Sequence, residues 1–471
     1  MRKTKIVCTL GPATDDYAVI KQLVKAGMNV ARLNMSHGTH AEHKKRIEMI
    51  KRVREETDSP VAVLLDTKGP EIRVKRFRDG AVTLADGQTF TLTANEVEGD
   101  AAAVSLTFKE LPGYVKPGQQ ILLNDGLIEL RALSVGKTDI VCRVQNGGEL
   151  SDLKKVNLPD CRIDMPYVSA ADREDILFAI GEDADYLAIS FVRSGDDVRL
   201  VRNILNQNGG DDIQIISKIE NREGVDRIEE ILALSDGIMV ARGDMGVEIP
   251  FEELPAIQKD LIKRSYRAGK KVITATQMLE SMLYNPRPTR AEASDVANAV
   301  YDGTSAVMLS GETAAGRFPV EAVRAMDKIV KSAENSINYQ GRFDKNDAVI
   351  VTVPDAVSHS TVAAAFDLSA KAIICVSHSG YTARKVSRFR PGCVIIAATV
   401  NQKVFYQLAL NWGVVPVRSV IQKTTDALFE HAIHCAKSTG LIKSGDLVVI
   451  TSGSAVGRSG NSNIMRIEIV N

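Results

Sequence analysis

Short runs of apolar, mostly β-branched residues alternate with longer amphipathic segments along much of the chain. The apolar runs predict eight strands, at Lys5–Leu10, Met28–Leu33, Val61–Leu65, Tyr186–Phe191, Ile213–Lys218, Gly237–Ala241, Lys271–Ala275 and Ser305–Leu309. The segments between and after them predict helices, at Asp15–Ala26, Ala41–Glu56, Ala171–Glu182, Asp196–Asn206, Val225–Leu234, Glu252–Ala268, Arg290–Val300 and Val320–Ser336. Eight apolar strands that each precede a helix favour a closed (β/α)₈ TIM barrel, an α/β fold. An open doubly wound sheet fits less well, because no GxGxxG turn follows the first strand.

This alternation breaks at two places, and each break predicts a further domain. Residues 71–166 are strand-like, with turns such as Asp79-Gly80 and Asn124-Asp125-Gly126, which predicts an inserted small β-barrel domain. From about residue 341 to residue 471 a few strands alternate with helices, which predicts a C-terminal α/β domain with strands at Ala372–Val376, Val394–Ala398, Val414–Val417 and Leu447–Thr451. The barrel domain then comprises residues 1–70 and 167–340. The insertion follows the third strand on the catalytic side, where it can act as a lid.

Composition and charge argue against several classes of function. The 59 Lys and Arg residues balance the 59 Asp and Glu residues, so no net field draws the chain to nucleic acid or to an anionic membrane. No apolar run approaches the ~18 residues of a membrane span, and no secretory signal opens the chain. The six cysteines form no CxxC pair, as is usual for reduced thiols. We therefore expect a cytoplasmic protein without nucleic-acid or membrane partners.

Polar or turn-forming residues end every predicted barrel strand. They stand at Gly11-Pro12, Asn34-Met35-Ser36-His37, Asp66-Thr67-Lys68, Ser190-Phe191-Val192-Arg193, Lys218-Ile219-Glu220, Arg242-Gly243-Asp244, Thr276-Gln277 and Ser310-Gly311-Glu312. Any one of them could merely terminate a strand or cap a helix. Because all eight strand ends meet at one rim of a barrel, together they predict an active site there.

Two carboxylates at neighbouring strand ends, Glu220 and Asp244, are suitable ligands for Mg²⁺, which takes one or two protein carboxylates together with substrate oxygens and water. The alternative for the pair alone is solvated or salt-bridged acids. Lys218 lies two residues before Glu220 and so points to the same side of its strand. A lysine beside a metal suits a site in which negative charge develops on a phosphoryl group or an enolate.

Other strand ends carry further groups for binding anions and cations. Arg32 and Arg73 offer guanidinium forks for phosphate or carboxylate. Four hard oxygen ligands with one net negative charge favour a monovalent cation, and they are Asn34, Ser36, Asp66 and Thr67. The hydroxyl of Thr276 ends the seventh strand near the same centre. Because neither a P-loop nor the HRD and DFG motifs occur, a kinase here would use neither common nucleotide-binding fold.

At these residues the chain resembles the pyruvate kinase family. The matching segments run through the whole chain, at Lys5–Pro12, Asn29–Gly38, Leu64–Arg73, Asn124–Leu127, Val156–Pro159, Ile215–Asn221, Ile238–Pro250, Val272–Leu279, Asn285–Asn298 and Asp302–Ala314. The strings ITATQML, NPRPTRAE and MVARGDMGVEIP are long and specific. The resemblance implies transfer of the phosphoryl group of phosphoenolpyruvate to ADP, which gives pyruvate and ATP, and it implies a homotetramer.

The resemblance also implies roles for individual residues. Glu220 and Asp244 would hold Mg²⁺ (or Mn²⁺), and the four oxygen ligands named above would hold K⁺. Lys218 would bridge the phosphoryl group and the enolate oxygen, while the backbone at Gly243 and Thr276 would hold the substrate carboxylate, with Thr276 on the face where the enol carbon is protonated. The nucleotide would be held by Arg32, Asn34, His37, Arg73 and Lys154.

Two positions near the insertion bear on how these roles are carried out. Lys155 and Asp160 stand where relatives commonly have the glycines of Lys-Gly-Val-Asn-Leu-Pro-Gly, so the resting angle of the lid can differ. Glu71 adds negative charge near the proposed K⁺ ligands, and relatives with lysine at this position resemble enzymes that do without K⁺. The resemblance therefore implies that the activity of this chain depends on K⁺.

The C-terminal domain carries a candidate effector site. Ser377, Ser379, Gly380 and Thr382 lead into a helix, where hydroxyls and backbone N–H groups can bind an anion. A second loop with Arg458 could close over the same pocket. The alternative is that the hydroxyls cap the helix and the glycines only form turns. In allosteric relatives the corresponding loops bind a phosphorylated effector, which implies a sugar phosphate or nucleotide monophosphate here.

Two other functions would share parts of this pattern. A phosphoenolpyruvate-group aldolase or lyase would also use Mg²⁺ in a barrel, but it needs neither a nucleotide lid nor K⁺ ligands. A catalytically silent scaffold or effector sensor would keep the fold, but Lys218, Glu220, Asp244 and Thr276 are all intact.

Overall fold

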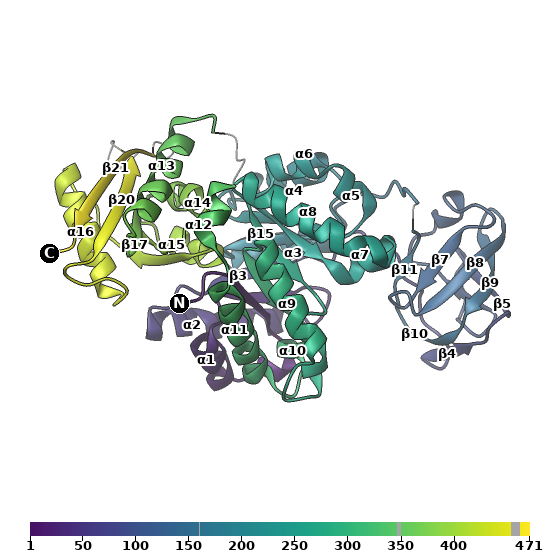
Figure 1. The fold of residues 1–471 in the computed structure, drawn as a ribbon. Coiled ribbons are helices and arrows are strands. Elements are labelled where there is room, and N and C mark those ends of the chain that lie inside the picture. The colour runs from purple at the N-terminus through teal and green to yellow at the C-terminus, as the bar shows by residue number, and fades with distance from the viewer. Residues whose placement is uncertain (160, 346–349, 454–461) are drawn as a thin grey trace.

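Eight parallel strands close into a barrel, as the sequence predicts. The computed structural model describes residues 1–159, 161–345, 350–453 and 462–471 (Figure 1). The barrel strands are β1 (Lys5–Thr9), β2 (Val30–Asn34), β3 (Ala62–Asp66), β12 (Tyr186–Ile189), β13 (Gln214–Ile219), β14 (Gly237–Ala241), β15 (Lys271–Ala275) and β16 (Ala306–Leu309). They pair in the order β1-β16-β15-β14-β13-β12-β3-β2. All eight predicted strands are confirmed.

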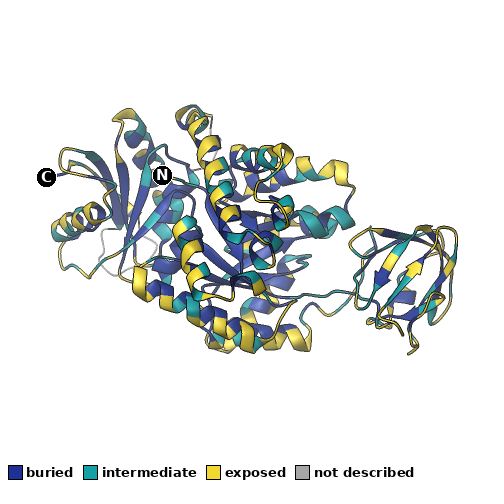
Figure 2. Cartoon of the chain, turned by 90° about the horizontal axis from the view of Figure 1, so that it is seen from below, coloured by how far each residue is buried: buried dark blue, intermediate teal, exposed yellow. Residues whose placement is uncertain are grey.

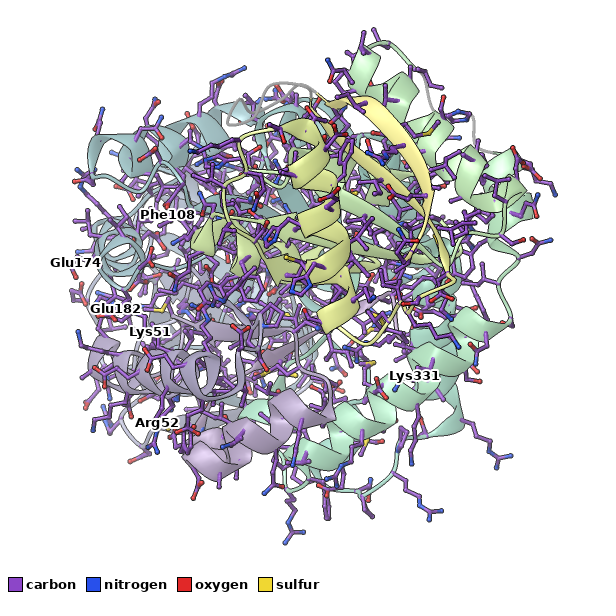
Figure 3. The ribbon with its side chains drawn as sticks, turned by 90° about the vertical axis from the view of Figure 1, so that its left-hand side faces the viewer. Lys51, Arg52, Phe108, Glu174, Glu182 and Lys331 are labelled. Atoms are coloured by element: carbon purple, nitrogen blue, oxygen red, sulfur yellow. The ribbon has the colours of Figure 1, made fainter. Side chains whose placement is uncertain are left out.

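Amphipathic helices surround these strands. They are α1 (Tyr17–Ala26), α2 (His40–Thr57), α3 (Ala170–Gly181), α4 (Gly195–Gln207), α5 (Arg222–Asp226), α6 (Ile228–Leu234), α8 (Leu254–Arg267), α9 (Arg290–Asp302) and α11 (Pro319–Asn335). Thr39 begins α2 with a capping box to Glu42, as Thr289 begins α9 with Glu292. The single helix expected at Val225–Leu234 is in fact two, because the chain leaves helical geometry at Arg227. Between helices, Glu182 pairs with Lys51 at 3.9 Å on the surface (Figure 3).

The barrel is filled with side chains. The C-terminal part of the chain closes the end at which the strands begin. Val7, Val30 and Tyr186 belong to the interior cluster, which also includes Ala409 and Leu410 from the 3₁₀ turn Leu408–Leu410. The Tyr186 hydroxyl donates to the Gln407 carbonyl. Buried residues follow the strands while the outer helix faces are exposed (Figure 2). The C-terminal part therefore closes one end of the barrel, and the last residues of the strands, such as Asn34, Asp66 and Ala241, lie at the other end.

The insertion is all-β and has its own apolar core. Its strands are β4 (Ala81–Leu84), β5 (Thr89–Thr93), β6 (Ala103–Ser105), β7 (Gln120–Leu123), β8 (Ile128–Val135), β9 (Asp139–Asn146), β10 (Gly148–Ser151) and β11 (Val156–Asn157). They form a six-stranded sheet, β11-β7-β8-β9-β5-β6, and a two-stranded sheet, β10-β4. Phe90, Leu130 and Leu150 lie in the core of this unit, separate from the barrel core. In Figure 1 the unit projects from one side of the barrel, away from the C-terminal part of the chain.

The C-terminal part is α/β, as predicted, with a five-stranded sheet in the order β19-β18-β17-β20-β21. Its strands are β17 (Ala372–Val376), β18 (Val394–Thr399), β19 (Val414–Arg418), β20 (Leu447–Gly453) and β21 (Ser462–Ile469), with helices α12 (Tyr339–Asp344), α13 (Val353–Asp367), α14 (Tyr381–Arg388), α15 (Gln402–Gln407) and α16 (Thr425–Ser438). The sequence pattern did not predict β21, an edge strand antiparallel to β20. Within the described ranges, no helix is long and apolar enough to cross a membrane.

Candidate active site at the barrel mouth

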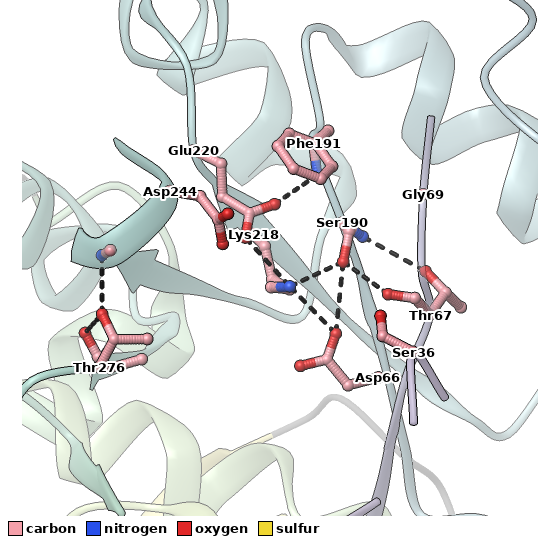
Figure 4. Close-up of polar contacts among 12 residues, drawn as sticks. Ser36, Asp66, Thr67, Gly69, Ser190, Phe191, Lys218, Glu220, Asp244 and Thr276 are labelled. Atoms are coloured by element: carbon pink, nitrogen blue, oxygen red, sulfur yellow. Dashed lines mark hydrogen bonds and ion pairs between the residues drawn. The ribbon is translucent and has the colours of Figure 1, made fainter. Parts of the chain in front are cut away.

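Lys218 lies at the centre of the mouth, near the end of β13 (Figure 4). Its ammonium donates to the Ser190 hydroxyl at 2.7 Å and lies 3.2 Å from Asp66 Oδ1 and 3.0 Å from Glu220 Oε1. Ser190 Oγ in turn donates to the Thr67 carbonyl at 2.6 Å. Three strand ends thus position one ammonium group among carboxylate and hydroxyl oxygens.

The charge of Lys218 is fixed by its neighbours. Burial alone lowers the pKa of a lysine, but the carboxylates of Asp66 and Glu220 outweigh it and hold the pKa of Lys218 above its ordinary value. The side chain therefore remains an ammonium near neutral pH. It can act as an electrophile toward developing negative charge, but not as a general base.

Glu220 and Asp244 lie close together beside this lysine, as predicted (Figure 4). Glu220 is fully buried: its Oε2 accepts the Phe191 N–H at 2.6 Å, while Oε1 accepts no hydrogen bond within the described structure. Burial raises the pKa of Glu220 to about 7, against the opposing charge of Lys218. Asp244 lies in α7 (Arg242–Glu248), a short helix after β14 that the sequence pattern did not predict. Lys155 and Lys218 together outweigh its burial and keep its pKa below the usual value.

The two carboxylates have the properties of a divalent-cation site. A buried carboxylate is costly unless a cation pairs with it, and in this structure the Lys218 ammonium, 3.0 Å from Oε1, pairs with Glu220. Asp244 is paired with the ammonium of Lys155, 2.7 Å from Oδ1, so this carboxylate is already held by a positive charge. Among the described residues, no group of three or more His, Cys, Asp or Glu side chains could hold a metal, at this site or elsewhere. Two carboxylates leave most of an octahedron to substrate and water, as Mg²⁺ permits.

The four proposed ligands of a monovalent cation come from adjacent strand ends. Asn34 of β2 pairs in register with Asp66 of β3. The Ser36 N–H donates to Asn34 Oδ1 at 3.2 Å, and Thr67 Oγ1 accepts the Ser190 N–H at 3.3 Å. Figure 4 shows Ser36, Asp66 and Thr67 side by side. The structure therefore brings this set together within reach of Lys218.

Arg32 lies under this set, on β2. Its Nε donates to Asp66 Oδ2 at 2.6 Å, and its Nη1 donates to Thr9 Oγ1 at 2.9 Å. The guanidinium is almost entirely buried, with 7% of the residue exposed. A cation held so rigidly at the barrel mouth can orient a phosphate without a large loss of side-chain entropy.

Thr276 and Gly243 face each other at the opposite side of the mouth. The Gly243 N–H donates to Thr276 Oγ1 at 2.8 Å, and a Cβ atom at position 243 would lie 3.3 Å from the same oxygen. Thr276 has φ 67°, which is costly for a β-branched residue. Backbone strain of this kind is found at active sites, where the surrounding structure maintains it.

The proposed nucleotide ligands Arg73 and Lys154 lie where the insertion joins the barrel. Arg73 pairs with Glu71 and donates to the Leu153 carbonyl at 2.7 Å, and the Lys154 carbonyl accepts the Val74 N–H. Burial and the charges of Arg32 and Arg73 lower the pKa of His37. His37 and both arginines therefore share one electrostatic environment near the mouth.

Two contacts at the site were missed by sequence reasoning. Ser190 was identified only as part of a strand end, although its hydroxyl contacts Lys218. Lys155 was identified only as a hinge substitution, but its ammonium lies 2.6 Å from Glu71 Oε1 as well as 2.7 Å from Asp244 Oδ1. This bridge links the insertion to α7. Asp160, the second hinge substitution, lies outside the described residues.

The predicted effector residues lie at the N-terminus of α14. Gly380 has φ 74°, a conformation that favours glycine, and forms the N-cap of the helix. The Thr382 and Ser462 hydroxyls are 2.6 Å apart. The Ser377 N–H donates to the Ala398 carbonyl, and the Ser379 carbonyl accepts from Arg384. Arg458 lies outside the described residues.

Known proteins resemble the chain over its full length. Residues 1–323 match a family model described as the pyruvate kinase barrel domain, and residues 355–468 match one described as the pyruvate kinase alpha/beta domain. Pyruvate kinases of Staphylococcus aureus (strain MRSA252) and Staphylococcus haemolyticus (strain JCSC1435) are 50% and 49% identical, over 100% of this chain and 81% of theirs. A crystal structure of a pyruvate kinase from Cryptosporidium parvum superposes with a TM-score of 0.94 at 41% identity, over 100% of this chain and 96% of that one.

Proposed function

The chain belongs to the pyruvate kinase family, and we propose that the residues at its barrel mouth carry out that family's reaction. It is a phosphotransferase that moves the phosphoryl group of phosphoenolpyruvate to ADP, the final step of glycolysis, giving pyruvate and ATP. The observation that carries the residue assignment is the buried ammonium of Lys218, held between Asp66, Ser190 and Glu220. The Lys218→Met substitution, followed by measurement of kcat and KM for phosphoenolpyruvate, tests this assignment.

Lys218 stabilises the charge that appears as the phosphoryl group leaves the enolate oxygen. Phosphoryl transfer depends mainly on positioning and electrostatic stabilisation. When bound, Mg²⁺ or Mn²⁺ on Glu220 and Asp244, and K⁺ on the Asn34, Ser36, Asp66 and Thr67 set, would neutralise charge on the phosphoryl group and on the substrate oxygens. The fixed guanidinium of Arg32 orients a phosphate next to Lys218.

Thr276 serves the second half of the reaction, protonation of the enol carbon. Its hydroxyl is fixed by the Gly243 N–H at 2.8 Å and donates to the Ala275 carbonyl at 2.6 Å. If the substrate carboxylate accepted the Gly243 N–H, Thr276 Oγ would lose that hydrogen bond. Its hydroxyl could then pass a proton, through a water molecule, to the enol carbon. A proton delivered on one face converts the enolate to pyruvate and makes the transfer irreversible in practice.

As a lid, the insertion would close over the mouth and bring Arg73 and Lys154 to the nucleotide. Excluding water protects the phosphoryl group from hydrolysis and strengthens the electrostatic contacts in the site. In this structure the Lys155 ammonium of the insertion forms an ion pair with Asp244. A divalent cation that binds Asp244 would take the place of that ammonium. The proposed domain boundaries at residues 70–71, 166–167 and 340–341 remain predictions, as do the homotetramer and the cytoplasmic location.

Family membership sets aside the two alternative functions. An aldolase or lyase of the phosphoenolpyruvate-binding group would leave the insertion without a role. A catalytically silent scaffold would have no use for the buried charges around Lys218, whose burial costs free energy.

Replacing Glu71 by lysine should relax the requirement for K⁺. Without K⁺, the wild-type chain is expected to lose about 100-fold in kcat, since a positive charge beside the transferring phosphoryl group is missing. An ammonium at position 71 would supply that charge. The ratio of activities in KCl and in tetramethylammonium chloride measures the effect.

Glu71→Gln is the matched control for this substitution. It removes the same carboxylate but adds no ammonium, so its activity should still depend on K⁺. Full wild-type activity in buffer free of Na⁺ and K⁺ would rule out the proposed cation site.

We propose that the loop at Gly380 binds a phosphorylated effector, because the corresponding loops of allosteric relatives do so. If the effector favours the active state, it should tighten phosphoenolpyruvate binding by about 5- to 150-fold. Thr382→Glu places a carboxylate where the phosphate would lie and should abolish this shift while kcat at saturation stays nearly unchanged. Phosphoenolpyruvate saturation curves with and without sugar phosphates or AMP measure it.

Thr382→Ser, which keeps the hydroxyl that contacts Ser462, should respond like the wild type. If no compound of the panel moves the wild-type curve or the melting temperature, the loop is only a helix cap.

A further inference from the structure

A strongly basic cavity lies away from the barrel mouth, at the joint between the barrel and the C-terminal part of the chain. Its volume is about 490 Å³. Six of its lining residues are cationic and none of those described is acidic, the six being Lys263, Arg267, Arg342, Lys345, Arg388 and Arg390. A cavity of this size accommodates a small organic molecule.

Three separate segments supply these cations. Lys263 and Arg267 lie on α8 of the barrel, Arg342 lies on α12, and Arg388 and Arg390 come from the end of α14. The opposite end of α14 carries Gly380, so the cavity is distinct from the proposed effector loop. A ligand bound here would contact the barrel and the C-terminal part together.

Arg390 is the most informative member of the group. Only 5% of the residue is exposed, and its Nη2 donates to neutral acceptors, the Gly303 carbonyl at 3.0 Å and Ser305 Oγ at 3.1 Å. Its Nε is buried and has no hydrogen-bond partner within the described structure. Burial, and then the charge of Arg342, lower the pKa of Arg390 to about 9. Among the described residues, the Nη2 hydrogen bonds of this buried guanidinium reach neutral oxygens and no carboxylate.

The neighbouring cations contact both charged and neutral partners. Arg388 donates to Asp355 at 3.1 Å, and Asp355 is shared with Lys385 at 2.7 Å. Arg342 donates to the Tyr301 carbonyl at 2.6 Å, which is a neutral acceptor. Lys263 and Lys345 are exposed at the rim. Like charges gathered around a cavity repel one another, and a bound polyanion would relieve that repulsion.

We propose that this cavity binds a small molecule that carries one or more phosphate groups, at a site separate from the barrel mouth. Guanidinium groups can bind two phosphate oxygens at once, in bidentate geometry. The lysines at the rim, Lys263 and Lys345, add positive charge on flexible side chains. The half-buried Tyr266 ring gives the cavity an apolar wall for the rest of the molecule. By mass action, a ligand that binds only the folded chain raises its melting temperature.

The single tryptophan of the chain provides a local reporter. Trp412 stacks on the Arg390 guanidinium, with 4.7 Å between the guanidinium carbon and the ring centroid. Inorganic pyrophosphate, titrated in the absence of divalent metal, should change the Trp412 emission along a saturable curve and raise the melting temperature. Potassium chloride of matched ionic strength should do neither.

Lys263→Glu combined with Lys345→Glu reverses two exposed rim charges, and it should weaken the pyrophosphate response of Trp412 at least about tenfold. The matched control, Lys25→Glu with Lys328→Glu, reverses two exposed lysines elsewhere and should respond like the wild type. Unchanged kcat in each variant shows intact folding. An equal response in the rim variant and the wild type, or a wild-type response reproduced by chloride, would overturn the proposal.

Discussion

Lys218→Met is expected to lower kcat by about 10³-fold, with little change in KM for phosphoenolpyruvate. That loss corresponds to ~4 kcal/mol of transition-state stabilisation. The ammonium of Lys218 lies among Asp66, Ser190 and Glu220, and its charge matters most when the enolate oxygen loses the phosphoryl group. Binding of the substrate itself depends on several other groups, so KM should change much less. Steady-state kinetics with saturating ADP, Mg²⁺ and K⁺ measure both constants.

Lys271→Met is the matched control, because it removes a buried lysine from the opposite end of the same barrel. Lys271 begins β15, and its ammonium donates to Gln214 Oε1 at 2.6 Å. Its loss should affect stability but leave kcat within a few-fold of the wild type. A Lys218→Met enzyme that keeps a tenth of wild-type kcat would remove Lys218 from the mechanism.

Glu220→Gln should weaken binding of the divalent cation by about 100-fold, ~2.7 kcal/mol, and lower kcat/KM accordingly. The substitution keeps the shape of the side chain but removes one of only two carboxylates at the site. Titration of Mn²⁺ followed by electron paramagnetic resonance, without substrates, measures the affinity independently of activity.

Glu223→Gln, three residues further along and partly exposed, should leave Mn²⁺ affinity unchanged. Equal Mn²⁺ affinity in Glu220→Gln and in the wild type would show that Glu220 is not a ligand.

Much of the barrel could be predicted from the sequence because each strand is specified by a short run of consecutive residues. Strands buried on both faces appear as uninterrupted apolar runs, and the residue that follows each run reaches the mouth by topology alone. For this reason the apolar pattern alone is enough to bring Lys218, Glu220, Asp66 and Thr276 to one rim.

The elements that were missed depend on information that is not local. In β21 every second side chain is exposed, and three of these exposed side chains, Met465, Ile467 and Ile469, are apolar, so the strand lacks the usual alternation of buried apolar and exposed polar residues. Its position is fixed by pairing with β20. The helix α7 has seven residues, too few for a periodic pattern to appear. The contacts of Ser190 with Lys218 and of Lys155 with Asp244 join residues 28 and 89 positions apart. No spacing rule specifies such pairs.

Phosphoryl transfer from phosphoenolpyruvate to ADP can be measured by incubating the purified chain with phosphoenolpyruvate, Mg²⁺ and K⁺, with and without ADP, and quantifying pyruvate and ATP together. Pyruvate and ATP should form in equal amounts when ADP is present, and almost no pyruvate should form when ADP is omitted. Pyruvate formed at the same rate without ADP, or no product under either condition, would contradict phosphoryl transfer to ADP.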